Sequence, residues 1–156
     1  MAPVTLDTAA ATMTSSIVLD VDLSRWDDSI VLLIGTDDSN SFPYDTELWL
    51  IGFVATSWMS LDMSHVVRPS ESDPSHTRWR IDHIELVEYG DGVAAEFSSY
   101  GDGGPRGKIH CRSIDMEWVD RRVLDERFPG WWEPGSPLVR PGIRAVMDRT
   151  VAEISG

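Results

Sequence analysis

The sequence predicts a mainly β protein: a small antiparallel up-and-down β-barrel with a C-terminal helix. Runs of strand length alternate apolar and polar residues, or are rich in β-branched and aromatic residues. Asp-Gly pairs separate several of these runs, and Asp-Gly is a strong hairpin signal because glycine accepts the positive φ of such turns. About seven or eight antiparallel strands must hide their edges, and a closed barrel hides them most completely.

A single domain accounts for most of the chain. With 156 residues, 42% of them hydrophobic, the chain is long enough to bury one substantial core. Its start, MAPVTLDTAAATMTSS, has neither the basic region nor the apolar region of a signal peptide. We therefore predict a flexible arm over residues 1–15 and one barrel domain over residues 16–156.

Four strands are predicted in the first half of the domain. Residues 16–23 alternate apolar and acidic side chains, as a half-buried strand does. Residues 29–35 form a β-branched run typical of a buried strand, although a helical turn also fits. The last two strands are predicted over residues 47–57 and 59–68, which contain the β-branched and aromatic residues that strands favour. Residues of these types are poor to middling helix formers.

The second half contains four more runs of strand length: 78–89, 93–100, 108–119 and 121–128. Tyr-Gly-Asp-Gly occurs at 89–92 and again at 100–103, so the copies lie one strand and one turn apart. We interpret both copies as turns of a meander.

Proline and glycine predict an extended strap over residues 129–142. Residues 141–154 then read as an amphipathic helix, with one apolar side made by Ile143, Val146, Met147, Val151 and Ile154. The rival fold is an α+β cone, a curved sheet with helices folded into its mouth, and it would require Glu47–Ser64 to be helical. Both folds enclose a pocket.

The charge limits the classes of partner. The net charge is −13, and residues 1–78 hold 12 of the 26 acidic residues but only 3 of the 13 basic ones. Such a surface repels nucleic acid and anionic lipid. The longest uncharged run, residues 48–61, is too short to span a bilayer. One cysteine, Cys111, excludes an internal disulfide and fits a reducing compartment, so we expect a cytoplasmic protein in which this thiol is buried and structural.

No motif fixes a chemistry. The four histidines lack metal-ligand spacing, although His83 and His110 could meet across neighbouring strands. Phosphate-binding loops and the serine nucleophile elbow are also missing from the sequence, so we expect no metal and no cofactor. Asp115 and Glu117 alternate along one strand, about 7 Å apart by strand rise, and we expect them on its outer face. Glu96 has apolar sequence neighbours and is a candidate acid or base.

Tryptophan is the most unusual feature of the composition, with seven residues in the chain. Core packing explains most of them, but pockets for apolar small molecules are also lined by aromatic residues. We predict such a pocket around four tryptophans of the expected sheet: Trp49, Trp58, Trp79 and Trp118.

Residues 42–100 resemble a known family. The runs FPYDTELW, VVRP, RWRIDHIELVEYGDG and VAAEF occur there in that order. In this order they resemble the small actinobacterial β-barrel cyclases of spirotetronate and related polyketide pathways, which look like the allene-oxide-cyclase barrel. The glycine-rich late strands and the closing Trp-Arg strand of that family are missing, and the strap and helix stand in their place. Residues 84–97 also fit the cone-shaped fold of polyketide cyclases and ketosteroid-isomerase relatives.

The resemblance implies a cofactor-independent cyclase or isomerase of antibiotic biosynthesis. A linear, apolar, polyketide-like substrate would fold inside the barrel and close a ring, with a [4+2] step as one form of the closure. The four tryptophans and Tyr44 would shape the pocket. Tyr100 or His110 would donate a hydrogen bond to a carbonyl, and Glu96 would act as acid or base.

Two other functions stay open. An acidic binding protein, such as an immunity protein that neutralises a basic partner, fits the small size and the charge. A carrier would share the cavity of the cyclase without turnover. A cyclase is expected to enclose an accessible cavity, whereas a binding protein is expected to keep a filled core and expose acids on one face. The sequence leaves open whether the chain forms a homodimer.

Overall fold

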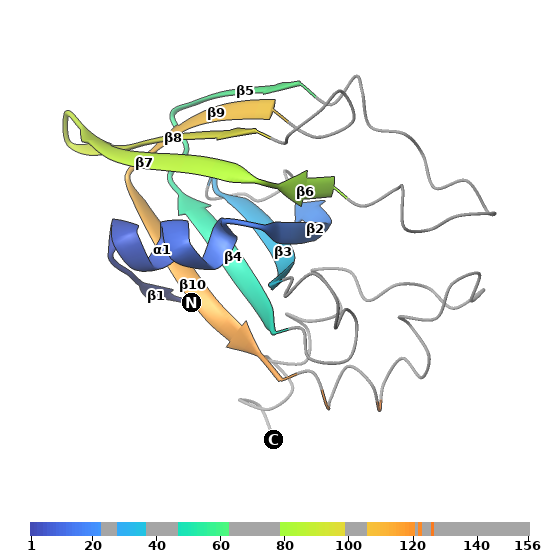
Figure 1. Ribbon diagram of the computed structural model, residues 1–156. Helices are drawn as coiled ribbons and strands as arrows, with labels where there is room; N and C mark the ends of the chain where they lie inside the picture. The colour runs from blue at the N-terminus through green and yellow to red at the C-terminus, as the bar shows by residue number, and fades with distance from the viewer. Residues whose placement is uncertain are drawn as a thin grey trace.

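The computed structural model describes residues 1–22, 28–36, 47–62, 79–98, 106–120, 122 and 126. Within them the chain is mainly antiparallel β, as predicted, with a single helix (Figure 1). The described part of the chain holds no helix long and apolar enough to cross a membrane. The elements are β1 (Ala2–Pro3), α1 (Leu6–Met13), β2 (Ser16–Asp22), β3 (Ile30–Thr36), β4 (Leu48–Val54), β5 (Trp58–Asp62), β6 (Trp79–Ile81), β7 (His83–Tyr89), β8 (Gly92–Ser98), β9 (Arg106–Cys111) and β10 (Ser113–Val119).

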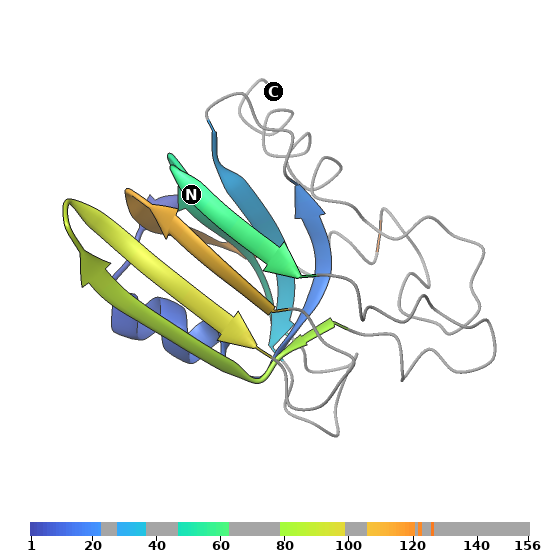
Figure 2. The same ribbon diagram turned by 90° about the horizontal axis from the view of Figure 1, so that it is seen from above.

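The strands form two sheets that face each other across the core (Figures 1 and 2). One has the order β1-β10-β4-β3-β2-β6, and the other has the order β5-β9-β8-β7. Every pairing is antiparallel. The order is not a simple up-and-down one, because β5 is followed in the chain by β6 but lies beside β9. The chain thus forms two meanders, β2-β3-β4 and β7-β8-β9. They are joined because β5, which follows β4, pairs with β9, and β10, which follows β9, pairs with β4.

Within the described residues, three stretches of chain pass from one sheet to the other. Only Asp82 separates β6 from β7, only Arg112 separates β9 from β10, and residues 55–57 separate β4 from β5. Two backbone hydrogen bonds continue the pairing through the last two bends: Arg112 N donates to Val54 O at 2.9 Å, and Ser57 N donates to His110 O at 2.9 Å. Bent strands shared in this way make the corners of orthogonally packed sheets. Pairing therefore continues around the core from sheet to sheet.

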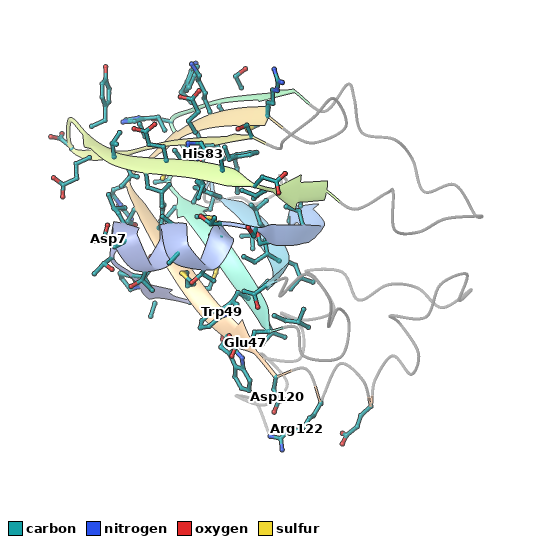
Figure 3. The ribbon with its side chains drawn as sticks, viewed as in Figure 1. Asp7, Glu47, Trp49, His83, Asp120 and Arg122 are labelled. Atoms are coloured by element: carbon teal, nitrogen blue, oxygen red, sulfur yellow. The ribbon has the colours of Figure 1, made fainter. Side chains whose placement is uncertain are left out.

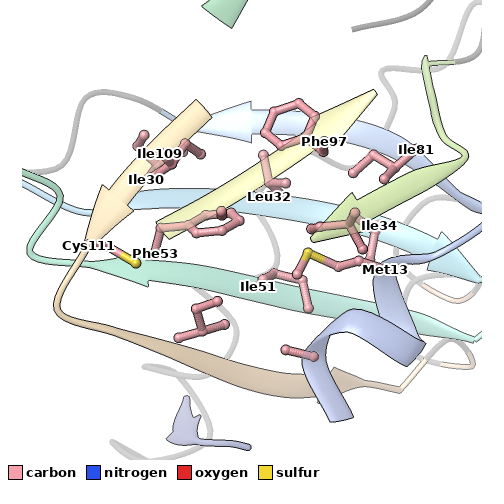
Figure 4. Packing of buried hydrophobic residues seen from close by; sticks show 14 of the residues in the cluster. Met13, Ile30, Leu32, Ile34, Ile51, Phe53, Ile81, Phe97, Ile109 and Cys111 are labelled. Atoms are coloured by element: carbon pink, nitrogen blue, oxygen red, sulfur yellow. The ribbon is translucent and has the colours of Figure 1, made fainter. Parts of the chain in front are cut away.

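Hydrophobic side chains fill the interior between the sheets (Figure 4). Phe53 and Ile51 of β4 meet Phe97 of β8 and Ile109 of β9 there, each at most 5% exposed. Both sheets contribute alternate residues, as the pattern of period two requires. Among the described residues, the space that the sequence predicted as an aromatic-lined cavity is a packed core.

The first 15 residues are not the flexible arm that we predicted. Ala2 and Pro3 pair with β10, and residues 6–13 form α1, which contacts β7, β10 and β3. The side chain of Thr5 caps the helix by accepting from Thr8 N at 3.3 Å. Ala9 and Met13 are fully buried in the core. The alanine-rich run is thus a helix whose apolar side covers one side of the core.

The segment from Glu47 onward is confirmed as strands through its described part, residues 47–62. The α+β cone is therefore wrong for this chain, since it needs a helix there. The sequence is apolar on successive residues because β3 and β4 are buried on both faces. Four residues that do not belong to the core cluster between the sheets are nevertheless at most 1% exposed: Val31, Leu33, Leu48 and Leu50. Strands buried on both faces lose the alternation of a half-buried strand.

Other predictions have mixed outcomes. The turn at residues 89–92 is confirmed, with Gly90 at φ 59°. The run 121–128 was predicted as a strand, but its two described residues, Arg122 and Glu126, have helical backbone conformation. Asp120 accounts for this difference, because its carboxylate accepts from Arg122 N at 3.0 Å, as a helix cap does. The second turn, the strap over 129–142 and the helix over 141–154 lie outside the described residues.

Replacing Met13 by alanine tests the position of the N-terminal segment. Met13 is fully buried, so Met13→Ala should lower the free energy of unfolding by about 2–5 kcal/mol. Met59→Ala is the matched control. Met59 is 45% exposed, so this variant should lose much less unfolding free energy. Urea denaturation measures both. Equal and small losses of unfolding free energy in the two variants would instead support the flexible arm predicted from the sequence.

Candidate functional site

The outer face of the four-stranded sheet carries two rows of side chains. The pairing aligns Trp58, His110, Ala94 and Val87 across β5, β9, β8 and β7. The next row along the strands consists of Ser60, Lys108, Glu96 and Glu85. One row is therefore largely apolar and aromatic, whereas its neighbour is polar and charged.

A pocket of about 470 Å³ lies over these rows, within the usual size range of small-molecule sites. Its walls come from β5 and from three strands that follow one another in the sequence, β7, β8 and β9. Trp58 is 54% exposed and Tyr89 is 65% exposed, so two aromatic side chains stand out from the sheet beside it. The outward-facing lining residues are Trp58, Glu85, Val87, Tyr89, Ala94, Glu96, Lys108 and His110.

His110 is held by contacts on both ring nitrogens. Its Nδ1 lies 2.6 Å from Ser57 Oγ, and its Nε2 lies 3.4 Å from the backbone carbonyl oxygen of Tyr89. A carbonyl oxygen only accepts, so Nε2 carries the hydrogen and Nδ1 of the neutral ring accepts from the Ser57 hydroxyl. The Tyr89 ring stands edge-on to the imidazole, with centroids 5.4 Å apart at an interplanar angle of 87°. These contacts orient the ring, and the carbonyl contact favours the tautomer with its hydrogen on Nε2.

The bend between β4 and β5 positions Ser57. Ala55 has a positive φ of 50°, and its N donates to the hydroxyl of Ser29 at 3.3 Å. Thr56 N donates to Asp28 O at 2.7 Å, and its hydroxyl donates to Phe53 O at 2.9 Å. Ser57 also donates from its backbone N to His110 O. The serine is exposed, but the backbone that carries it is tied to β3, β4 and β9.

The charges of the second row are exposed. Lys108 Nζ lies 3.9 Å from Glu96 Oε1, and the two side chains are 59% and 61% exposed. A pair so open to water contributes little to stability. Glu85 lies directly opposite Glu96, and like charges in that position repel. The row therefore has one cation facing two carboxylates.

Three predicted site residues meet at this pocket: Trp58, Glu96 and His110. The surroundings of Glu96 differ from the prediction, however. Its neighbours Val93, Ala95 and Phe97 point into the core, so its carboxylate lies on the opposite, solvated face. An alternating strand separates residues that are adjacent in the sequence.

The tryptophans predicted to line one cavity lie in different places. Trp49 and Trp118 are partners in the β4–β10 pairing. Figure 3 places Trp49 near Glu47 and Asp120, at the end of β4 away from the four-stranded sheet. Trp49 packs partly against the core and Trp118 is 52% exposed. Tyr44, Tyr100 and the side chain of Trp79 lie outside what the structure describes.

Sequence reasoning missed Ser57 and Tyr89 as members of the site. Tyr89 is the first residue of a turn motif, and the alternation of residues 83–89 puts it on the same face as Glu85 and Val87. That alternation could have identified Tyr89 from the sequence. No sequence signal identified Ser57, because its contact depends on a bend in the chain and on a partner, His110, that lies 53 residues later.

The other titratable candidates lie elsewhere. Asp115 and Glu117 face outward on β10, whereas Ile114 and Met116 are buried, as expected. His83 and His110 do not lie on neighbouring strands, because β8 separates β7 from β9. Among the described residues, no three His, Cys, Asp or Glu side chains are grouped so that they could hold a metal ion.

Cys111 is free and buried, as predicted for a structural thiol. Burial raises the pKa of this thiol to about 11, and a hydrogen bond with the backbone of Ser113 opposes part of that rise. A thiol with so high a pKa is protonated at neutral pH and is a poor nucleophile.

Comparisons with family models, with curated proteins and with solved structures found no match for this chain. The resemblance of residues 42–100 to polyketide cyclases therefore stays a prediction.

The thiol makes stability depend on pH. Its pKa rises from an ordinary 9.0 to about 11 on folding, so the folded state holds a proton that the unfolded state loses. The corresponding stabilisation is fully present below pH 9 and is lost as the pH rises towards 11. Urea denaturation at pH 8, 9.5 and 10.5 should show that the free energy of unfolding falls as the pH rises. This fall should be smaller in Cys111→Ala than in the native protein. Parallel curves for the two proteins would contradict a raised pKa.

Proposed function

We propose that this protein binds an apolar small molecule in the pocket over β5, β9, β8 and β7 and acts on it as a cofactor-independent cyclase or isomerase. The observation that carries the proposal is the position of His110. This polarised imidazole, hydrogen-bonded to Ser57, lies among aromatic and apolar side chains in a pocket of about 470 Å³. A polyketide-like chain is the substrate class that we favour, from the resemblance of residues 42–100.

The walls of the pocket support binding of an apolar ligand. Trp58, Tyr89 and Val87 are each more than 40% exposed, and together with Ala94 they offer apolar surface on both sides of His110. Burying an apolar surface releases about 25 cal/mol per Å². A flat, unsaturated ligand would cover this surface, with the two aromatic rings as walls. Contacts of this kind favour a compact conformer, which is the main requirement of a ring closure.

The polar groups support proton transfer. The tautomer of His110 leaves Nδ1 as a base that the Ser57 hydroxyl contacts at 2.6 Å. A proton can therefore pass from the serine hydroxyl to the ring and be returned to a carbonyl or an enol of the ligand. Positioned acid–base groups of this type accelerate reactions about 10²–10⁴-fold. Glu96 and Lys108 line the same pocket and would orient polar ends of the ligand.

The proposed site lies outside the sheet rather than inside a barrel. The interior between the sheets is occupied by Phe53, Ile51, Phe97 and their neighbours. The setting that we propose is a cytoplasmic enzyme of actinobacterial antibiotic biosynthesis, with a small molecule as partner. A buried, free Cys111 is compatible with a reducing compartment.

A filled core also favours a second candidate function, an acidic protein that binds and neutralises a basic partner. Trp58 and Tyr89 stand beside the carboxylates of Glu85 and Glu96 on one exposed face. Aromatic residues and complementary charge are typical of protein interfaces, and the chain has a net charge of −13. Binding of a basic protein instead of a small molecule would identify this function.

A fluorescence titration with prodan, a neutral naphthalene dye, tests the pocket. Saturable binding of one dye per chain is expected. Trp58→Ala should weaken it about tenfold, because it removes one aromatic wall. Trp118→Ala is the matched control: Trp118 is 52% exposed against 54% for Trp58, but it lies on β10 and does not line the pocket.

Two results would contradict the small-molecule proposal. One is linear uptake of dye without saturation, which would leave the basic-partner function as the better candidate. The other is an equal loss of binding in Trp58→Ala and Trp118→Ala, which would place the dye elsewhere on the surface.

A further inference from the structure

We infer that Ser57 is a nucleophile, activated by His110, which accepts acyl groups from esters or thioesters of apolar acids. The inference rests on the proposed function and specifies its substrate class, since it makes the ring-closing substrate an acyl donor. It concerns a residue that no sequence motif indicated. Three features of Ser57 support this assignment: its contact with a base, the orientation of that base, and its position at the edge of the pocket.

The contact has the geometry of a nucleophile and its general base. Ser57 Oγ lies 2.6 Å from His110 Nδ1, within the hydrogen-bond reach that such pairs require. The same hydroxyl also donates to His110 O at 3.2 Å, so its one proton has two acceptors. The contact of Nε2 with Tyr89 O leaves Nδ1 as the nearer of these two acceptors. A serine hydroxyl needs a base of this kind because it is a weak nucleophile by itself.

A third group orients the base. The backbone carbonyl of Tyr89 accepts from His110 Nε2 and so keeps the free lone pair at Nδ1, facing Ser57. In catalytic triads a carboxylate fulfils this function. A carbonyl oxygen selects the tautomer equally well but bears no full charge, so we expect a slower enzyme. The edge-on ring of Tyr89 restricts rotation of the imidazole further.

The serine lies at the edge of the pocket. Ser57 is exposed and is not itself a lining residue, but its neighbour Trp58 and its partner His110 both line the pocket. The acyl chain of a bound ester can therefore lie along the apolar row while its carbonyl carbon reaches Oγ. Cys111 follows His110 in the chain but is 1% exposed and faces the core, so it does not compete as a nucleophile.

The reaction balances without a further reagent. Ser57 Oγ bonds to the carbonyl carbon and transfers its proton to His110 Nδ1. The bond from that carbon to the leaving oxygen or sulfur then breaks, and the imidazolium protonates the leaving group. A hydroxyl of the acyl chain, or water, next attacks the acyl-serine. It gives its proton to Nδ1, and the proton passes to Ser57 as the acyl bond breaks. Attack by the hydroxyl closes a lactone ring, whereas attack by water releases the free acid.

Acylation by p-nitrophenyl hexanoate tests the inference on the full chain. The release of p-nitrophenolate gives the rate, intact mass gives the stoichiometry, and peptide mapping gives the site. One hexanoyl group is expected on Ser57. Ser57→Ala should abolish it, and His110→Gln should slow it at least about 100-fold. Ser60→Ala is the matched control, since Ser60 is an exposed serine three residues further along the chain that lies opposite Lys108 instead of His110; this variant should acylate at the native rate.

Ser57→Cys should retain acylation, which separates loss of the nucleophile from loss of the fold. Acylation of Lys108, or an equal rate in Ser57→Ala, would overturn the inference. Saturable prodan binding without acylation would also overturn it while leaving the proposed function intact. Absence of both prodan binding and acylation would overturn the two together.

Discussion

The bend between β4 and β5 is the constraint on which both the core and the site depend. Hydrogen bonds from Arg112 N to Val54 O and from Ser57 N to His110 O continue the pairing of two long strands from one sheet into the other. Before the bend, alternate side chains such as Ile51 and Phe53 face the core. After it, Trp58 projects from the outer face. Ser57 lies at the end of the bend, where its hydroxyl contacts the imidazole of His110 on the opposing strand β9. The short serine–histidine contact is thus a product of the corner that joins the sheets.

The strands were predictable where local pattern determines them. The Asp-Gly turn after Tyr89, the alternation of β2 and β8 and the β-branched run of β3 each indicated the correct element. The pairing was not predictable. Nothing local in residues 58–62 indicates that they lie beside β9 rather than beside the next strand in the chain. The helix was missed because an alanine- and threonine-rich start reads as a tail, whereas its stability comes from burying Met13 and Ala9.

The site was predictable only in part, for the same reason. Composition drew attention to tryptophan, and Trp58 does line the pocket, but Trp49 and Trp118 pair with each other on the other sheet. Composition counts aromatic residues without assigning them to faces. His110 and Glu96 were identified from their type and neighbours, and the pairing brings them onto one face. The partner of His110 required three-dimensional information, because Ser57 belongs to a bend with no recognisable motif.

Because β3 and β4 are buried on both faces, the chain is exposed to association while it is being synthesised on the ribosome. β4 pairs with β10, so residues 48–54 lack one neighbour until residues 113–119 have left the ribosome. Until then Leu48 and Leu50 on one face, and Ile51 and Phe53 on the other, have no complete sheet to bury them. Pairings this distant in the sequence form slowly, and exposed apolar strands associate with one another. The nascent chain therefore passes through a long interval in which its most apolar strand is a ligand for chaperones.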